Sequence, residues 1–93
     1  MVNAVRGEVV VSLAGVERRL CLTLGALAEI ETGLGVEGPA GLAERMRALS
    51  ARDLIVVLRA LLRGGGEAVE VADGADPREA ALAMARAFEA SVG

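Results

Sequence analysis

The chain has 93 residues, with ten basic and thirteen acidic side chains and a net charge of −3 at pH 7. It contains no His, Trp or Tyr, and only one Cys and one Phe. This length fits one domain over residues 1–93. The acidic balance excludes the broad positive field that nucleic-acid binding uses, so we expect no nucleic-acid partner. Because His, the commonest general base, is missing, we expect no enzyme.

The chain is apolar for its size, with a mean hydropathy of +0.50. An apolar surplus in so small a domain usually forms a contact surface, so we expect a protein partner or self-association into a homo-oligomer. No apolar run approaches the roughly 18 residues of a membrane span. Met1 to Arg6 also lacks the apolar region of a signal peptide. We therefore expect no membrane partner and a cytoplasmic location.

Two runs of alternating apolar and polar residues, at about 6–13 and 16–22, flank Ala14-Gly15. Because Gly tolerates the positive φ of a tight turn, the pattern predicts a β-hairpin over residues 6–22 with a two-residue loop. Arg18 then falls on the apolar side. Either it lies at the edge of the sheet with its stem over the core, or the register is shifted. The expected pairs are Leu13 with Val16, Val9 with Leu20 and Val11 with Arg18.

A lone hairpin is barely stable in water, so it must pack on the helices that follow. Thr23 is a suitable N-cap for a helix over about 24–34, which Gly33 and Gly35 would end. Pro39 suits the first turn of a second helix over about 39–49. The apolar stripes expected to face the core are Leu24, Leu27, Ile30 and Leu34 in the first helix, and Leu42, Met46 and Leu49 in the second.

A third helix over about 51–63 is expected to be the central one, because it is apolar around most of its circumference. Ser50 and Asp53 have capping-box spacing at its start. Gly64-Gly65-Gly66 is predicted to form its C-cap and a hinge. Residues 67–75 are predicted to follow as a flexible extended loop or a short edge strand.

The sharpest local signal is Asp76-Pro77-Arg78-Glu79, which places an N-cap, an N1 proline and a capping-box acid in order. It predicts a fourth helix over about 77–91. The expected fold is therefore α+β and mainly helical, with an N-terminal β-hairpin packed on about four short helices. The apolar stripe of the fourth helix is expected at Ala81, Met84, Ala85, Phe88 and Val92.

No group of residues has the spacing of a metal or catalytic site. Cys21 stands alone, and Glu29 and Glu31 cannot share one helix face at a spacing of two. We therefore expect no metal, no cofactor and no catalytic residue.

Four residues are candidates for partner binding. Val10 and Arg19 lie on the hairpin face that need not meet the helices, where an exposed edge accepts a partner strand, although an ordinary solvated face also explains them. Arg59 and Arg63 are placed to pair with acidic residues of a partner, although stabilisation of a helix C-terminus also explains them.

Residues 6–66 resemble the small tail-assembly-chaperone family of gene transfer agents and related tailed phages. The resemblance rests on several short motifs that occur in one order with nearly fixed gaps. These are Arg6-Gly7-Glu8, Leu22-Thr23-Leu24-Gly25-Ala26-Leu27, Glu29, Glu31, Leu34-Gly35, Leu49-Ser50-Ala51-Arg52-Asp53-Leu54 and Leu61 to Gly66.

The resemblance implies a non-enzymatic tail-assembly chaperone, which binds the tape-measure or tail-tube protein while the tail of a phage-like particle is built. An apolar groove that captures amphipathic helices would suit such work. One alternative is a minor structural tail component that stays in the particle. Another, from a different class, is a regulatory adaptor that binds a host protein.

Overall fold

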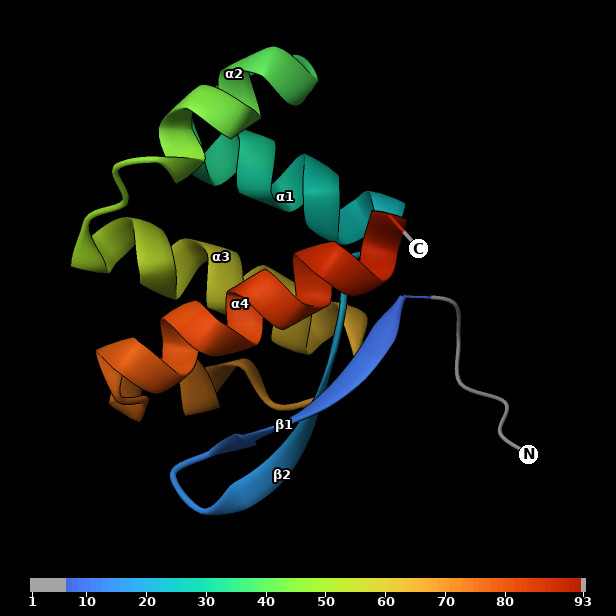
Figure 1. Cartoon of the computed structure of the whole chain (residues 1–93), viewed down its shortest axis with the longest axis vertical. Helices are drawn as coiled ribbons and strands as arrows, with labels where there is room; N and C mark the ends of the chain where they lie inside the picture. The colour runs from blue at the N-terminus through green and yellow to red at the C-terminus, as the bar shows by residue number, and fades with distance from the viewer. Residues whose placement is uncertain (1–6, 93) are drawn as a thin grey trace.

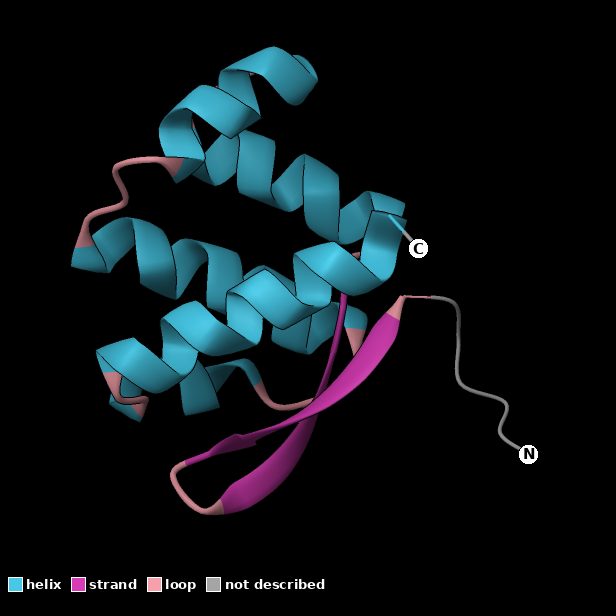
Figure 2. Ribbon diagram, in the orientation of Figure 1, coloured by secondary structure: helices cyan, strands magenta, loops and turns pink. Residues whose placement is uncertain are grey.

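The computed structural model describes residues 7–92, and its hairpin lies against one side of a helical layer (Figure 1). Helices α3 and α4 cover the hairpin, α1 packs on α3, and α2 contacts α1 at the far side from the strands (Figure 2). The α+β, mainly helical fold that the sequence predicts is therefore confirmed. In chain order the elements are β1 (Glu8–Leu13), β2 (Val16–Cys21), α1 (Leu24–Leu34), α2 (Gly38–Met46), α3 (Ala51–Gly64), the 3₁₀ helix η1 (Val69–Gly74) and α4 (Pro77–Val92).

The hairpin has the predicted register. Leu13 pairs with Val16 and Val9 with Leu20, and both turn residues have positive φ, 55° at Ala14 and 80° at Gly15. The strands are slightly shorter than expected, since β2 ends at Cys21, and the predicted first residue, Arg6, lies outside the described residues.

Arg18 resolves the alternative that the sequence left open. It pairs with Val11 in the predicted register, and its side chain is half-buried, with the guanidinium Nη1 3.4 Å from Glu67 Oε1. The arginine therefore lies over the core with its charged end directed to an acid, and no register shift is needed.

Helix α1 has the predicted bounds because both of its caps form. Thr23 Oγ1 accepts a hydrogen bond from the N–H of Ala26 at 3.0 Å, and Gly35 ends the helix with a left-handed φ of 72°. The predicted stripe is wrong at Leu24, which is 83% exposed. The buried positions of α1 begin only at Ala26, its third residue, and Leu24 points to solvent. The buried residues are Ala26, Ile30 and Leu34.

Helix α2 is shorter than predicted. It ends at Met46 instead of Leu49, because the N–H groups of Arg47 and Ala48 bond to carbonyls only three residues back. This tightening ends the α-helical repeat, and the chain then becomes extended at Ser50, the N-cap of α3.

Helix α3 is the central helix, as predicted. It contacts β2, α1, η1 and α4, and both partners of its capping box are formed between Ser50 and Asp53. Its almost fully buried residues are Val57, Leu58, Ala60, Leu61 and Leu62.

The glycine run after α3 packs tightly against β2. A Cβ atom at Gly64 would lie 2.2 Å from the carbonyl oxygen of Cys21, and one at Gly65 would lie 2.1 Å from that of Arg19. No side chain fits between these backbones. The contacts therefore favour a close-packing role for this run over the predicted hinge.

The prediction of an extended loop or strand after the glycines is wrong. Residues Val69–Gly74 form η1, and Ala72 is buried beneath the central helix. A strand here would need the free edge of β2, but the Glu67 carboxylate already accepts the N–H of Arg19 at 3.0 Å. Because this edge is occupied, the chain turns away from the sheet and folds onto α3.

Helix α4 starts where predicted, with Asp76 Oδ1 accepting the N–H of Arg78 at 2.7 Å. Glu79 does not complete a capping box. Its carboxylate instead accepts the N–H of Ala14 in the hairpin turn, at 3.0 Å.

The predicted apolar stripe of α4 is wrong at two positions. Ala81 and Ala85 are exposed, because α4 turns another face to β1 and α3. The side chain of Val92 lies outside the described residues. The buried residues of this face are Ala80, Ala83, Met84 and Ala87, with Phe88 half-buried beside them.

Candidate interaction surfaces

Val10 and Arg19, two predicted partner-binding residues, are direct cross-strand neighbours. Val10 is 46% exposed, so this face of the hairpin is open to solvent. The Arg19 backbone, however, is engaged by the Glu67 carboxylate, and the Arg19 side chain lies 3.7 Å from the same group. Strand addition at β2 is blocked beside Arg19, and a role of this pair in partner binding stays a prediction.

Arg59 and Arg63, the other predicted pair, lie one turn apart on α3 and both form ion pairs within the domain. Arg59 Nη1 is 3.3 Å from Asp73 Oδ1, and Arg63 Nη2 is 3.5 Å from Glu29 Oε2. They lie on α3, whereas Val10 and Arg19 lie on the two strands of the hairpin. Their charges are already matched inside the fold, and a contact with a partner stays a prediction for them too.

Glu67 joins the segment after α3 to the hairpin. It accepts the N–H of Arg19 and pairs with the guanidinium of Arg18. The hydrogen bond from Arg19 and the charge of Arg18 lower the pKa of Glu67, against an opposing effect of its partial burial. This carboxylate is therefore ionised in the folded protein at neutral pH.

Asp53 forms the corresponding polar contact at the other end of α3. It is only 5% exposed, and its carboxylate receives a two-pronged contact from Arg45 of α2, with Nη2 2.9 Å from Oδ1 and Nε 3.1 Å from Oδ2. The N–H of Ser50 and the Arg45 guanidinium lower the pKa of Asp53. Arg45 also donates to the carbonyl of Leu34 at 3.2 Å. One arginine thus ties α2 to both α1 and α3.

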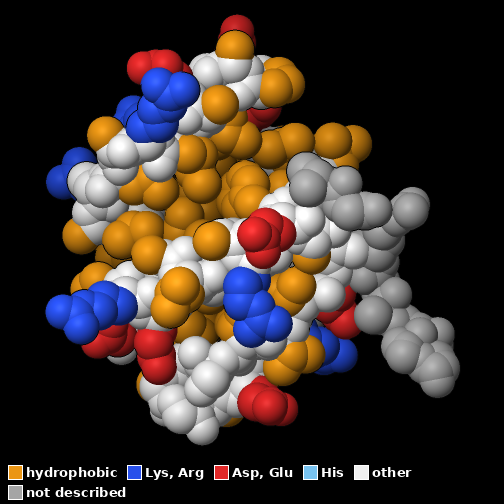
Figure 3. All heavy atoms as spheres, in the orientation of Figure 1, with side chains coloured by type: hydrophobic (Ala, Val, Ile, Leu, Met, Phe, Trp, Pro, Cys, Tyr) orange, Lys and Arg blue, Asp and Glu red, His pale blue; other side chains and the backbone are white. Residues whose placement is uncertain are grey.

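Between α2 and α4 the molecule has a hollowed apolar surface (Figure 3). Hydrophobic side chains gather there over α1 and α3, with α2 on one side and α4 on the other. We call this region the α2–α4 surface. The half-buried large apolar residues on these helices include Leu27, Met46, Leu54 and Phe88, and Leu49 lies in the loop between α2 and α3.

The sequence analysis missed this surface. It assigned Met46, Leu49 and Phe88 to stripes that face the core, and they do contact the core. The sequence did carry one sign of an exposed apolar surface, its high mean hydropathy of +0.50, which indicates more apolar residues than the core requires. Periodicity shows which residues share a face, but it does not show whether enough neighbouring elements exist to cover that face.

Two further depressions lie elsewhere on the helices. One, of about 560 Å³, lies between α1 and α3, with Gly33, Val56 and Arg59 among its lining residues. The other, of about 210 Å³, lies between α3, η1 and the start of α4, and is lined by Leu54, Ile55 and Pro77 among others. Their walls are mainly apolar, so they offer area for apolar contacts.

Within residues 7–92, no three His, Cys, Asp or Glu side chains are grouped to hold a metal ion. Burial, with a smaller contribution from the charge of Glu8, raises the pKa of the Cys21 thiol. A thiol that stays protonated is a poor nucleophile. The described part of the chain also contains no helix long and apolar enough to cross a membrane.

Comparison with protein families identifies what this small, apolar-surfaced domain is related to. The family described as phage tail tube protein, GTA-gp10, matches residues 6–92. The chain belongs to this family. The match runs through η1 and α4, beyond the limit at Gly66 that the sequence resemblance suggested. No match was found among curated proteins or among solved structures.

This family consists of tail proteins of phages and gene transfer agents. The prediction of a tail protein is thereby confirmed at this level.

Proposed function

We propose that this tail-family protein is an assembly chaperone that binds the tape-measure protein, or the tail-tube protein, before the tube is complete. The single observation that carries the proposal is the α2–α4 surface, a hollowed apolar area that lies open between two helices (Figure 3). A tape-measure or tail-tube protein that exposes amphipathic helices before assembly needs a partner's apolar surface to cover them and keep it soluble. An apolar groove is a common binding site for such helices.

The charge of the domain also supports this role. The net charge of −3 keeps a small apolar protein and its complex in solution. A chaperone of this kind needs a binding surface and carries out no reaction of its own. Assembly would take place in the bacterial cytoplasm.

A second function, a minor tail component retained in the particle, is favoured by the family description itself, which names a tail tube protein. A retained subunit needs a surface that repeats with its neighbours in the tube, and the α2–α4 surface would then be covered in the particle. Family membership favours both tail roles over the regulatory adaptor.

Two measurements separate these functions. Co-expression of the chain with the tape-measure protein of the same particle, followed by size-exclusion chromatography, is expected to give a soluble complex. Mass spectrometry of purified particles is expected to find the tape-measure protein without this chain. A chain present in stoichiometric amounts in the particle would contradict the chaperone role and support the retained component.

A further inference from the structure

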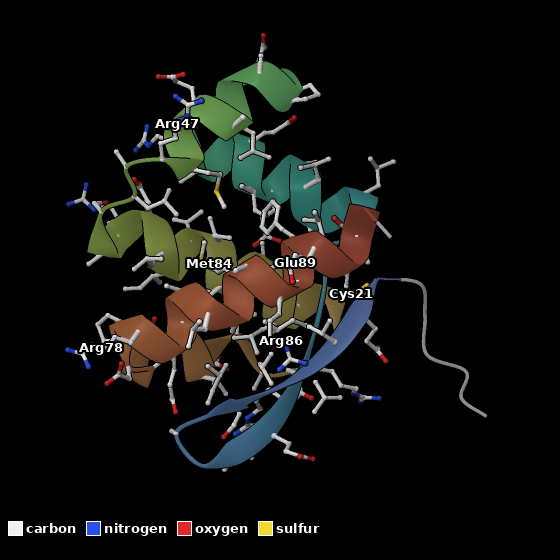
Figure 4. All side chains as sticks on the ribbon, in the orientation of Figure 1. Cys21, Arg47, Arg78, Met84, Arg86 and Glu89 are labelled. Carbon is white, nitrogen blue, oxygen red and sulfur yellow. The ribbon has the colours of Figure 1, made fainter. Side chains whose placement is uncertain are left out.

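The charges around the α2–α4 surface are unevenly placed. Arg47 lies where α2 ends and Arg78 where α4 begins, at the same end of the surface (Figure 4). Arg52, in the first turn of α3, belongs to that end as well. Within residues 7–92, none of these three arginines forms an ion pair, whereas five other arginines do.

The acids near this end do not cancel the three arginines. Asp53 is paired with Arg45, and Asp76 accepts the N–H groups at the start of α4. Glu44 is exposed on α2 one turn before Arg47. The end of the surface where α3 and α4 begin therefore keeps a positive balance in a domain whose net charge is −3.

The opposite part of the surface carries a negative group. Glu89, in the last turns of α4, lies at the border of the apolar area (Figures 3 and 4), and it too is exposed and without an ion pair among the described residues. The surface thus has an apolar middle, a positive end and a negative border. An occupant with the reverse polarity would match it along its whole length.

We propose that the α2–α4 surface binds one amphipathic helix of the partner in a fixed direction, with acidic residues or the helix C-terminus beside Arg47 and Arg78. This inference rests on the proposed function and deepens it. A helix satisfies its own backbone groups, which suits an apolar floor, and its negative C-terminal end complements the arginines. Alongside α4, whose 16 residues span about 24 Å, the occupant needs about four turns.

Helix α2 is the thinly packed wall of this site. Its larger packing contacts are with α1, and among the described residues of this helix Leu42 alone is buried. Arg45 holds its C-terminal end to Asp53.

The test uses charge reversal with a matched control. Arg47→Glu and Arg78→Glu change the positive end, whereas Arg86→Glu changes an unpaired arginine of α4 that lines a different depression, beside Val11 and Ser12 of β1. All three positions are exposed, so the variants should fold alike. We expect the double reversal R47E/R78E to weaken binding of the co-expressed tape-measure protein at least about tenfold, and R86E less than about twofold.

An apolar pair tests the floor of the site in the same way. Met46→Glu places a charge on a half-buried residue of α2, and Leu82→Glu places one on a residue of α4 that is 68% exposed in the other depression. M46E is expected to abolish the complex and L82E to retain it. Circular dichroism of each variant checks folding. If M46E is misfolded, the reversal pair decides alone.

A designed peptide separates failure of this inference from failure of the proposed function. The probe is a four-turn amphipathic helix with acidic C-terminal residues, compared with its Lys-substituted twin, and binding is followed by amide chemical shifts of α2 and α4. A tape-measure complex that is indifferent to R47E/R78E overturns the inference and leaves the chaperone role. Shifts with the acidic peptide, without a complex of the chain with either the tape-measure or the tail-tube protein, support the inference and overturn the chaperone role. No shift with either peptide and no complex with either tail protein overturns both.

Discussion

The two ends of α3 are held in different ways. At its C-terminal end the backbone of Gly64 and Gly65 meets the carbonyls of β2 with no room for a side chain, and Glu67 fixes the edge of that strand. At its N-terminal end the main tie to α2 is one polar contact, Arg45 with Asp53, and apolar area beside it stays open. The closed end stabilises the domain, and the open end leaves the α2–α4 surface exposed.

The largest expected effect comes from breaking the closed end. Gly65→Ala keeps a backbone conformation that alanine accepts, since φ is −89°, but it forces a methyl group onto the carbonyl oxygen of Arg19. We expect a loss of about 3 kcal/mol in unfolding free energy, measured by urea denaturation. Gly74→Ala, where no atom lies within 4 Å of the added carbon, is the control. Equal stability of the two variants would contradict the close-packing account.

A smaller effect is expected from Glu67→Gln, which keeps the shape of the side chain and removes its charge. The hydrogen bond to the Arg19 N–H is weakened and the ion pair with Arg18 is lost, so stability should fall by about 1 kcal/mol at pH 7. Glu70→Gln, an exposed acid three residues further along, serves as the control. The comparison fails if both substitutions have the same effect.

The same groups predict the direction of the pH dependence. The folded-state pKa values of Glu67 and Asp53 lie below their ordinary values of 4.5 and 3.8. The folded protein therefore releases these protons more readily than the unfolded chain, and the stabilisation is fully present above pH 4.5. Unfolding free energy should fall as the pH drops through and below that range. Denaturation curves at several pH values check this, with a shallower fall expected for Glu67→Gln.

The open end is probed by Arg45→Met, which removes the tie while retaining an apolar stem. The Asp53 carboxylate loses its counter-charge but keeps the hydrogen bond from the N–H of Ser50. Because α2 buries little besides Leu42, we expect the free energy of local opening of α2 to fall more than the free energy of global unfolding. Hydrogen exchange should become faster in residues 38–46 and stay unchanged in the centre of α3. Exchange that accelerates equally in both helices would show that α2 is part of the cooperative core.

The smallest effect is expected at Leu82, which is 68% exposed on α4. Leu82→Ser should change unfolding free energy by less than about 0.5 kcal/mol. Thermal denaturation checks this value. A large loss would mean that Leu82 is covered in solution, by a second copy or another contact.

The sequence predicted those parts of the fold whose determinants are local. The hairpin register followed from alternation and the Ala14-Gly15 turn, and the starts of α1, α3 and α4 followed from capping residues. It failed where distant contacts decide. The segment Val69–Gly74 is helical because Glu67 occupies the edge that a strand would need, and nothing local in the sequence shows this.

The same limit applies to the candidate site. The sequence placed Arg59 and Arg63 near the C-terminal end of the third helix, but it did not show their partners Asp73 and Glu29, which come from other parts of the chain. The α2–α4 surface arises because the larger packing contacts of α2 are with α1, so α2 and α4 stay apart. An apolar stripe in the sequence does not reveal whether a neighbouring element covers it.

The most direct test of the account is hydrogen exchange of the chain in its co-purified complex with the tape-measure protein. The account predicts new protection in α2 and along the exposed side of α4, with β1 and β2 unchanged. Protection of the hairpin face around Val10 and Arg19, with α2 still exchanging freely, would contradict it and place the partner on the strands.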